Sequence, residues 1–272
     1  MKRIFTLLVL ASLLLSCISA GAEGELTMKE LNTTDAFVIS LKRVARLTPP
    51  YTMEYKHYHV QQGAATDGKY AYTILENQVD DLCSIWKLDL NDFSVVETKY
   101  ALDLDHGNDM TYNPLLNQLL VVHNKPRYTR VSFVDPDTLE ILDAKTMPYQ
   151  IYSMAYEPVR DQYIIGISGS YDFVILDKDF KRVQRFKGTN TGLVKQGVDC
   201  DENYIYFPQC TSNATKNVIM VYDWEGNFVT QIRVQSFQEI ESLFHIGDDW
   251  YITFNASGSY IYKATLKLDE KK

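Results

Sequence analysis

The sequence has no long apolar run beyond its N-terminal segment. After residue 22, no stretch approaches the ~20 consecutive apolar residues that a membrane-spanning helix needs. Basic residues are outnumbered, with 27 Lys and Arg against 35 Asp and Glu and a formal net charge of −8. We therefore expect no general affinity for nucleic acid or for an anionic membrane surface. Hydrophobic residues make up 46% of the 272 residues, which is sufficient for a large core.

Cysteine is also scarce, and the count limits the disulfides that can form. Of the four cysteines, Cys17 falls within the apolar N-terminal segment, which leaves Cys83, Cys200 and Cys210. Three cysteines allow at most one disulfide, and a bridge between Cys200 and Cys210 is one interpretation. The interpretation that we favour is that all three are small buried strand residues.

Several motifs of metal-binding, nucleotide-binding and hydrolytic proteins are absent. The sequence contains no G-x-S-x-G, P-loop or G-x-G-x-x-G motif, so a serine hydrolase or a nucleotide-binding fold has no support. Residues 103–109 (DLDHGND) place acids at alternate positions, as a calcium loop does, but Pro114 stands where the later bidentate Glu belongs. We predict no cofactor and no metal ligands, with calcium as the alternative.

The first residues have the features of an export signal. Lys2 and Arg3 precede an apolar run, and a small-residue cleavage site follows, so residues 1–22 are predicted to be a signal peptide. The sequence around Cys17 also resembles a bacterial lipobox, which would leave Cys17 as a lipid-modified N-terminus. The protein is therefore expected to be secreted or held at the cell surface, with any membrane attachment made only through that lipid.

A repeat of about 44 residues dominates the rest of the chain. Each unit begins with a short strand, continues through a turn rich in Asp, Asn, Gly or Pro, and enters an alternating apolar strand. Aligning the units superposes five residues at spacings of 45, 44, 45 and 44: Gly63, Asn108, Tyr152, Gly197 and Glu241. The second half of the first four units repeats as well. There a strand ends in an aspartate that suits the start of a tight turn, namely Asp89, Asp135, Asp177 or Asp223.

Four short strands per repeat are typical of a β-propeller blade. The 19 Tyr and 12 Phe also favour strands. We predict an all-β protein with a single five-bladed β-propeller over residues 36–268. Because the fifth unit has only three clear strands, the N-terminal segment Ala36–Leu47 is expected to supply its fourth strand and so close the ring. Residues 23–35 form a polar lead-in, and residues 269–272 form a charged tail.

The start of each blade is where we expect a functional site. The first strand of each propeller blade lines the central channel, and the loops that lead into these strands form one mouth. The candidate catalytic residues there are Glu241, Asp109 and His106. The candidate ligand-binding residues are Gln62, Asn108, Tyr152 and Gln196. Further along, the same strands become apolar at Ala65, Met110, Met154 and Leu243. A channel whose polar side chains satisfy one another is the structural alternative.

The segments that open the blades resemble those of the plant-type glutaminyl cyclotransferases, exported five-bladed propellers that also occur in bacteria. That family opens its first blade with a Q-G pair, its next with a G-E-G-type segment and its last with an acidic N-E-L-E-like segment. Here the corresponding segments are Gln62-Gly63, His106-Gly107-Asn108 and Glu239–Leu243. Asn108 stands where the family has the Glu of G-E-G.

The resemblance implies a specific reaction, in which the α-amine of an N-terminal Gln attacks its own side-chain amide and ammonia leaves. Glu241 would then transfer the proton, with Tyr152, Asn108 or Gln62 as hydrogen-bond donors.

Three functions remain open. The first is a monomeric binder of a small molecule, peptide or glycan, helped by exposed loop aromatics such as Tyr128, Tyr171 and Trp224. The second is a glutaminyl cyclotransferase-like enzyme. The third is a carbohydrate-active hydrolase or lyase, which needs two facing carboxylates, and Asp109 and Glu241 are the available pair.

Overall fold

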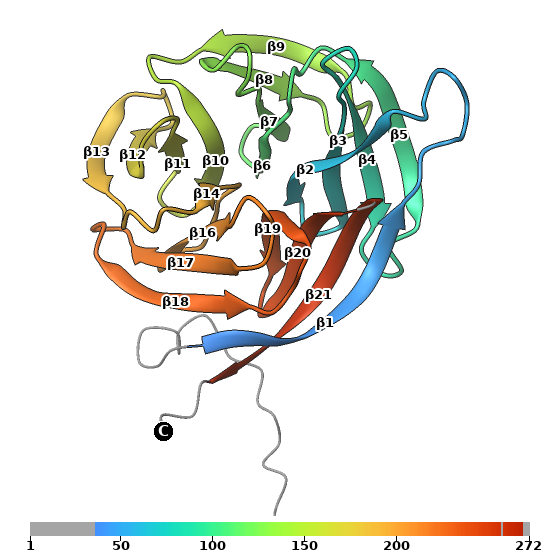
Figure 1. Ribbon diagram of the computed structural model, residues 1–272. Coiled ribbons are helices and arrows are strands. Elements are labelled where there is room, and N and C mark those ends of the chain that lie inside the picture. Colours follow the sequence, from blue (N-terminus) through green and yellow to red (C-terminus); the bar gives the residue numbers. More distant parts are fainter. Residues whose placement is uncertain (1–35, 257, 269–272) are drawn as a thin grey trace, which may run out of the picture.

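The computed structural model describes residues 36–256 and 258–268, and in this part of the chain all regular structure is β-strand. The strands form a ring of antiparallel blades around a central channel, a five-bladed β-propeller, as predicted (Figure 1). The described residues include no helix of the length and apolar character that crossing a membrane requires. The predicted signal peptide, lead-in and charged tail lie outside the described residues.

Each blade consists of four strands, counted outward from the channel. Blade 1 contains β2 (Tyr58–Thr66), β3 (Tyr70–Asn77), β4 (Leu82–Asp89) and β5 (Val95–Leu102). Blade 2 contains β6 (Asp109–Asn113), β7 (Gln118–Val122), β8 (Arg130–Val134) and β9 (Ile141–Thr146). Blade 3 contains β10 (Ile151–Glu157), β11 (Gln162–Ile167), β12 (Asp172–Asp177) and β13 (Arg182–Lys187).

Blade 4 differs in that its innermost strand is split in two. It contains β14 (Val194–Lys195), β15 (Asp199–Cys200), β16 (Tyr204–Cys210), β17 (Asn217–Asp223) and β18 (Phe228–Val234). Blade 5 contains β19 (Glu239–Ile246), β20 (Asp249–Ala256), β21 (Gly258–Leu268) and, as its outer strand, β1 (Ala36–Leu47).

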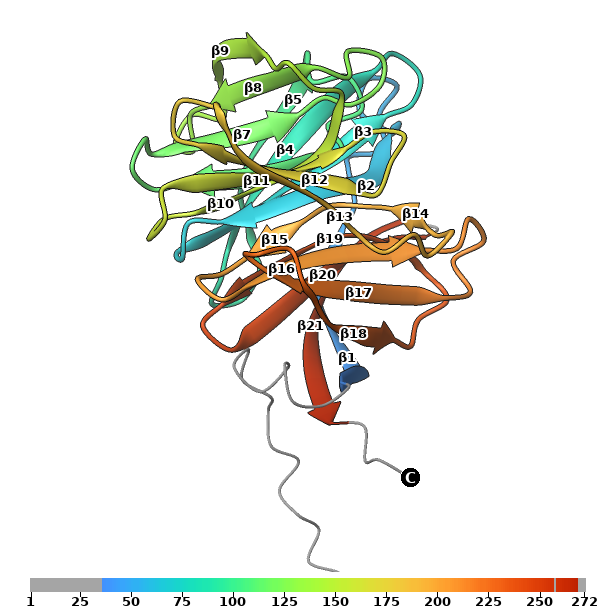
Figure 2. The ribbon, with the colours of Figure 1, turned by 90° about the vertical axis from the view of Figure 1, so that its left-hand side faces the viewer.

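The N-terminal strand closes the ring, as the sequence predicted. β1 pairs antiparallel with β21, in a register that runs from Ala36 opposite Leu268 to Leu47 opposite Ser259. It also makes a short parallel pairing with β18 of blade 4, which joins the two blades into one sheet (Figure 2). The open edge of the last blade is thereby covered by the other end of the chain.

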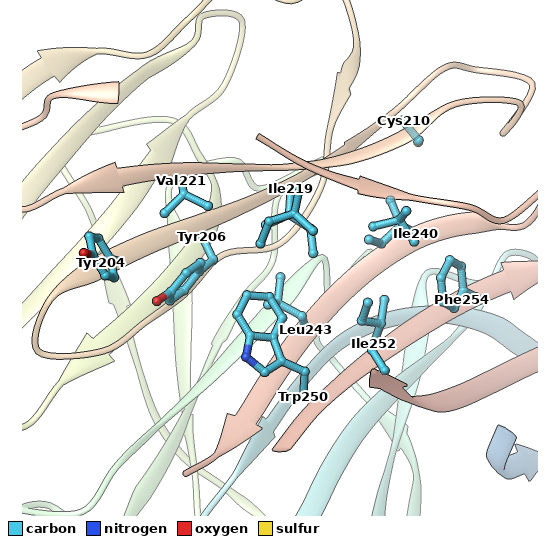
Figure 3. Close-up of a cluster of buried hydrophobic side chains, with 13 residues drawn as sticks. Tyr204, Tyr206, Cys210, Ile219, Val221, Ile240, Leu243, Trp250, Ile252 and Phe254 are labelled. Atoms are coloured by element: carbon cyan, nitrogen blue, oxygen red, sulfur yellow. The ribbon is translucent and has the colours of Figure 1, made fainter. Parts of the chain in front are cut away.

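The core is divided into five hydrophobic clusters, one at each interface between neighbouring blades. Figure 3 shows the cluster between blades 4 and 5, where the ring of Trp250 packs edge-on against Tyr206 at a centroid distance of 5.0 Å. Cys83, Cys200 and Cys210 are free thiols buried in three different clusters. The favoured interpretation of the cysteines is therefore confirmed, and the alternative bridge between Cys200 and Cys210 is wrong.

The repeated aspartates start the outer turns of the blades, as predicted. Each carboxylate accepts at least one backbone N–H from the turn that follows it, with the N–H groups of Asn91, Thr138, Asp179 and Asn227 as examples. These short local bonds explain why the repeat can be recognised in the sequence.

The innermost strands are irregular at one common height in the channel. Register shifts occur in β2 between Gln61 and Ala64, in β10 around Tyr152, and in β19 around Glu241. In blade 4 the break between β14 and β15 falls at Gly197. Four of the five residues aligned by the repeat thus sit at or within a local irregularity, and such irregularities turn side chains out of the regular strand alternation.

The fifth aligned position is followed by Asp109, whose side chain crosses the channel at this height. Its Oδ2 accepts the backbone N–H of Met154 in blade 3 at 3.0 Å and of Val198 in blade 4 at 2.9 Å. Its Oδ1 accepts the Ser242 hydroxyl of blade 5 at 3.1 Å. In blade 1, Gly63 packs directly on the Asp109 backbone. All five blades therefore meet at one residue, Asp109.

We predict that Gly63→Ala strongly destabilises the protein. The added Cβ would lie 2.5 Å from the Asp109 Cα and 2.6 Å from the Met110 nitrogen, and neither backbone atom can move without displacing β6. Overpacking of this kind costs about 1–3 kcal/mol, and we expect the upper end of that range in urea unfolding. Gly68→Ala is the control, because its Cβ meets nothing within 4 Å and adds only the strain of a positive φ. Equal losses in the two variants would contradict this account of the channel.

Candidate functional site

Asp109 divides the channel into two ends. We call the end formed by the loops that lead into the innermost strands the upper mouth, and the opposite end the lower cavity. Innermost strands of neighbouring blades contact one another around the ring. The predicted ligand-binding residues all lie at the channel and are largely buried: Gln62, Asn108, Tyr152 and Gln196.

Asn108 is held by two hydrogen bonds in the wall of the upper mouth. Its Nδ2 donates to the Tyr152 carbonyl at 2.6 Å, and its Oδ1 accepts from the Asn124 side chain at 2.8 Å. The residue that replaces the family's glutamate therefore links blades 2 and 3.

His106 is held at the upper mouth by Glu76, a residue without a recognisable signal in the sequence. Its Nδ1 lies 2.8 Å from Oε1 of Glu76, which comes from the end of β3. The His106 side chain is 31% exposed, whereas that of Glu76 is only 7% exposed. The other Glu76 oxygen, Oε2, is buried without a hydrogen-bond partner, and so is Oε1 of Gln61 on β2. Unpartnered buried acceptors of this kind are uncommon and cost free energy unless something binds them.

Glu241 is the buried acid of the upper mouth. Its burial and the neighbouring carboxylates of Glu239 and Glu76 raise its pKa well above the usual range, and a hydrogen bond with Asn255 offsets only part of this effect. Such a side chain can hold a proton at a pH where an exposed glutamate has lost it, which suits it to acid–base chemistry. Glu239 in turn accepts a hydrogen bond from Gln196 Nε2 at 3.2 Å.

Blade 4 adds a half-buried cation to the site. The Lys195 ammonium lies 4.6 Å from the ring centroid of Tyr152 and 5.4 Å from that of Tyr171. It donates to the carbonyl oxygens of Ser170 and Ile167. Burial lowers the pKa of Lys195. The upper mouth thus carries carboxylates from blades 1 and 5 and an ammonium from blade 4.

Asp109 is placed differently from the other candidate catalytic residues. Its side chain is fully buried, and both of its oxygens accept hydrogen bonds from other blades. Burial raises the pKa of Asp109, and these hydrogen bonds oppose the shift. An enclosed carboxylate cannot reach a substrate, so this geometry does not favour Asp109 and Glu241 as a hydrolytic pair.

A chain of hydrogen bonds in blade 2 has the order of a serine-protease triad. His123 Nδ1 lies 2.7 Å from Asp105 Oδ2, and His123 Nε2 lies 2.7 Å from Ser132 Oγ. Both His123 and Ser132 are completely buried, however, so no substrate can reach the hydroxyl. Arg127 contacts the carboxylates of Asp105 and Asp103, the two acids at the start of the stretch considered for calcium. The chain therefore stabilises the blade.

The predicted loop aromatics are only partly exposed. Trp224 is buried, with its indole N–H donated to the Asp201 carbonyl at 2.8 Å, so the expectation that it is exposed is wrong. The Tyr171 hydroxyl donates to the Leu193 carbonyl at 2.6 Å, and Tyr128 is 36% exposed.

Comparison with solved structures supports the architecture. A glutaminyl cyclase from Myxococcus xanthus superposes with a TM-score of 0.62 at 10% identity, covering 87% of this chain and 98% of that one. The chain shares its fold with that enzyme. A streptogramin B lyase is a more distant neighbour, with a TM-score of 0.47 at 9% identity and coverage of 85% and 98%. No protein-family model and no curated sequence matches the chain.

We predict that Glu241→Gln changes stability in a pH-dependent way. Because the folded state raises the pKa of Glu241, its contribution is most favourable below the unfolded pKa near 4.5 and is lost as the pH rises through the folded value. Gln removes the cost of ionising this buried group. The variant should therefore gain stability relative to wild type between pH 5 and 8, with no gain at pH 4, as measured by urea unfolding at each pH. A difference independent of pH would show that Glu241 has an ordinary pKa.

Proposed function

We propose that this protein is an exported propeller that binds, at its upper mouth, a small molecule or peptide bearing an amino group. The observation that carries the proposal is the set of acceptors without partners there. Glu76 Oε2 and Gln61 Oε1 are buried and unpaired, and the carboxylates of Glu76 and Glu239 each lie close enough to Glu241 to raise its pKa. An ammonium group donates three hydrogen bonds and carries the complementary charge. Export is inferred from residues 1–22, which lie outside the described residues.

The surroundings also favour a short, extended ligand over a large surface partner. Unlike Asp109, which is 0% exposed, Glu76 and Glu241 each keep 5% of their surface exposed, so only a narrow group such as a chain terminus can reach them. The Tyr152 ring of blade 3 is largely buried. Its face is already in contact with the Lys195 ammonium, so it offers a ligand little free surface. A glycan offers hydroxyl donors without a positive charge, so it would leave the carboxylates uncompensated.

A second candidate function is cyclisation of N-terminal Gln, which the shared fold and the environment of Glu241 favour. In this reaction the α-amine nitrogen bonds to the side-chain amide carbon, the bond from that carbon to the amide nitrogen breaks, and ammonia leaves. Glu241 would accept a proton from the attacking amine and deliver it to the departing nitrogen, a role that needs a pKa near neutrality. Asn108 would shape the site in this reaction without taking part in proton transfer, because its side-chain amide is already hydrogen-bonded to the Tyr152 carbonyl and to Asn124.

Binding is tested with a matched pair of peptides. Gln-Ala-Ala should bind at pH 7 by calorimetry, and its N-acetylated form should bind at least tenfold more weakly because the ammonium is lost. Glu76→Gln should weaken binding of the free peptide about tenfold, or roughly 1.4 kcal/mol. Glu202→Gln, which changes an exposed acid in the turn after β15, is the control and should leave the affinity unchanged. Equal binding of both peptides, or of neither, would refute the amine site.

Catalysis is tested with the same free peptide by measuring ammonia release. If Glu241 transfers the proton, wild type should turn over and Glu241→Gln should lose at least a hundredfold in kcat while still binding the peptide. Binding without turnover in wild type would reject the cyclase and leave the protein as a binder.

A further inference from the structure

The opposite end of the channel contains a second cavity, separated from the upper mouth by Asp109. This lower cavity has a volume of about 280 Å³, close to the lower end of the ~300–1,000 Å³ range of ligand pockets. Every blade contributes to its wall through the ends of the innermost strands and the turns that follow them. Of the four apolar residues predicted for this part of the channel, Ala65 and Met110 line the cavity, whereas Met154 and Leu243 are buried in the clusters between blades.

Most of the cavity wall consists of apolar side chains or of polar side chains that already have hydrogen-bond partners within the protein. Ala64, Met110, Val198 and Phe244 supply apolar surface from four different blades. The polar side chains on the rim mainly have partners of their own: the Thr66 hydroxyl donates to Tyr70, Asp67 accepts from Tyr70 and Tyr72, and the hydroxyls of Tyr112 and Tyr156 donate to Asn117 and Asp161. Such a wall offers a ligand few unpaired polar groups.

The exception is an ion pair between blades 4 and 5. His245 Nδ1 lies 2.5 Å from Asp199 Oδ2, and the two side chains are 17% and 19% exposed. Burial acts to lower the pKa of His245, but the nearby carboxylates of Asp199, Asp201 and Asp248 raise it to about 9, so the ring is an imidazolium at pH 7. Among the described residues, neither His245 Nε2 nor Asp199 Oδ1 has a hydrogen-bond partner. The His245 Nε2–H group is therefore a free donor and Asp199 Oδ1 a free acceptor, and the two residues lie side by side in the cavity wall.

We propose that the lower cavity is a second ligand site, which takes a small, uncharged, mainly apolar molecule carrying a hydroxyl group, such as a phenol. A hydroxyl can accept from the His245 N–H and donate to the Asp199 carboxylate at the same time. The ion pair has no net charge to offer a charged ligand, and the other polar groups of the wall already have partners, so a charged ligand would be desolvated there at a cost. The volume suits one ring with a short substituent.

This site is independent of the upper mouth. No side chain is shared between the two, and the filled layer at Gly63, Asp109 and Gly197 lies between them. A ligand in the lower cavity should therefore not compete with an amine at the other end, and failure of either proposal leaves the other untouched.

The probe is 4-methylphenol, compared with its methyl ether, which has the same ring but no hydroxyl donor. Binding is followed by the backbone amide shifts of residues 23–272 at pH 7. We expect 4-methylphenol to shift the amides of Ala65, Val198 and Phe244, and the ether to bind at least tenfold more weakly. Asp199→Asn should reduce phenol affinity by a similar factor.

A second variant keeps the test decisive if Asp199→Asn does not fold. Pro158→Trp places a large side chain on the exposed rim of the cavity and should abolish the shifts. Val159→Trp alters the adjacent residue, which is 78% exposed and does not line the cavity, and should leave them intact. Three results would overturn the proposal: equal binding of the ether and the phenol, unchanged binding in Pro158→Trp, or amide shifts confined to the outer strands of the blades.

Discussion

The structure depends on one buried carboxylate at the centre of the ring. Asp109 accepts two backbone N–H groups and one hydroxyl from three other blades, and the strand of the remaining blade packs against its backbone. Blade–blade contact elsewhere consists mainly of hydrophobic packing, which is non-directional, and of hydrogen bonds that each join only two blades, such as that from Asn108 to the Tyr152 carbonyl. Hydrogen bonds to a single side chain are directional, and they set the height at which all five innermost strands meet.

The same constraint explains the interruptions in the innermost strands. To direct N–H groups at Asp109, β10 must shift register near Tyr152, and blade 4 must break its strand at Gly197. A side chain beyond Cα at Gly197 would meet the carboxylate itself at 2.7 Å. Irregularities of this kind turn side chains out of the regular strand alternation, and here they lie at the same height as Asp109, next to Gln62, Tyr152 and Glu241.

Hydrogen-bond order alone does not identify a catalytic group in this molecule. The chain Asp105–His123–Ser132 reproduces the order of a triad, yet His123 and Ser132 are completely buried and the chain serves the packing of blade 2. Glu241 has no such familiar pattern, but it lies at the upper mouth among other carboxylates, where its proton affinity is raised. Access and electrostatic surroundings therefore separate the candidate functional residue from the structural ones.

The sequence by itself determined the blade count, the closing strand β1 and the turn aspartates, because each depends on local periodicity or on bonds within a few residues. Only the tertiary structure decided the roles of the polar residues. Asp109 and Glu241 are both acids near the start of an innermost strand, and they differ only in what other blades bring to them. Glu76 and the pair His245–Asp199, whose members are 46 residues apart, gave no local signal, since their partners come from other blades or loops distant in the chain.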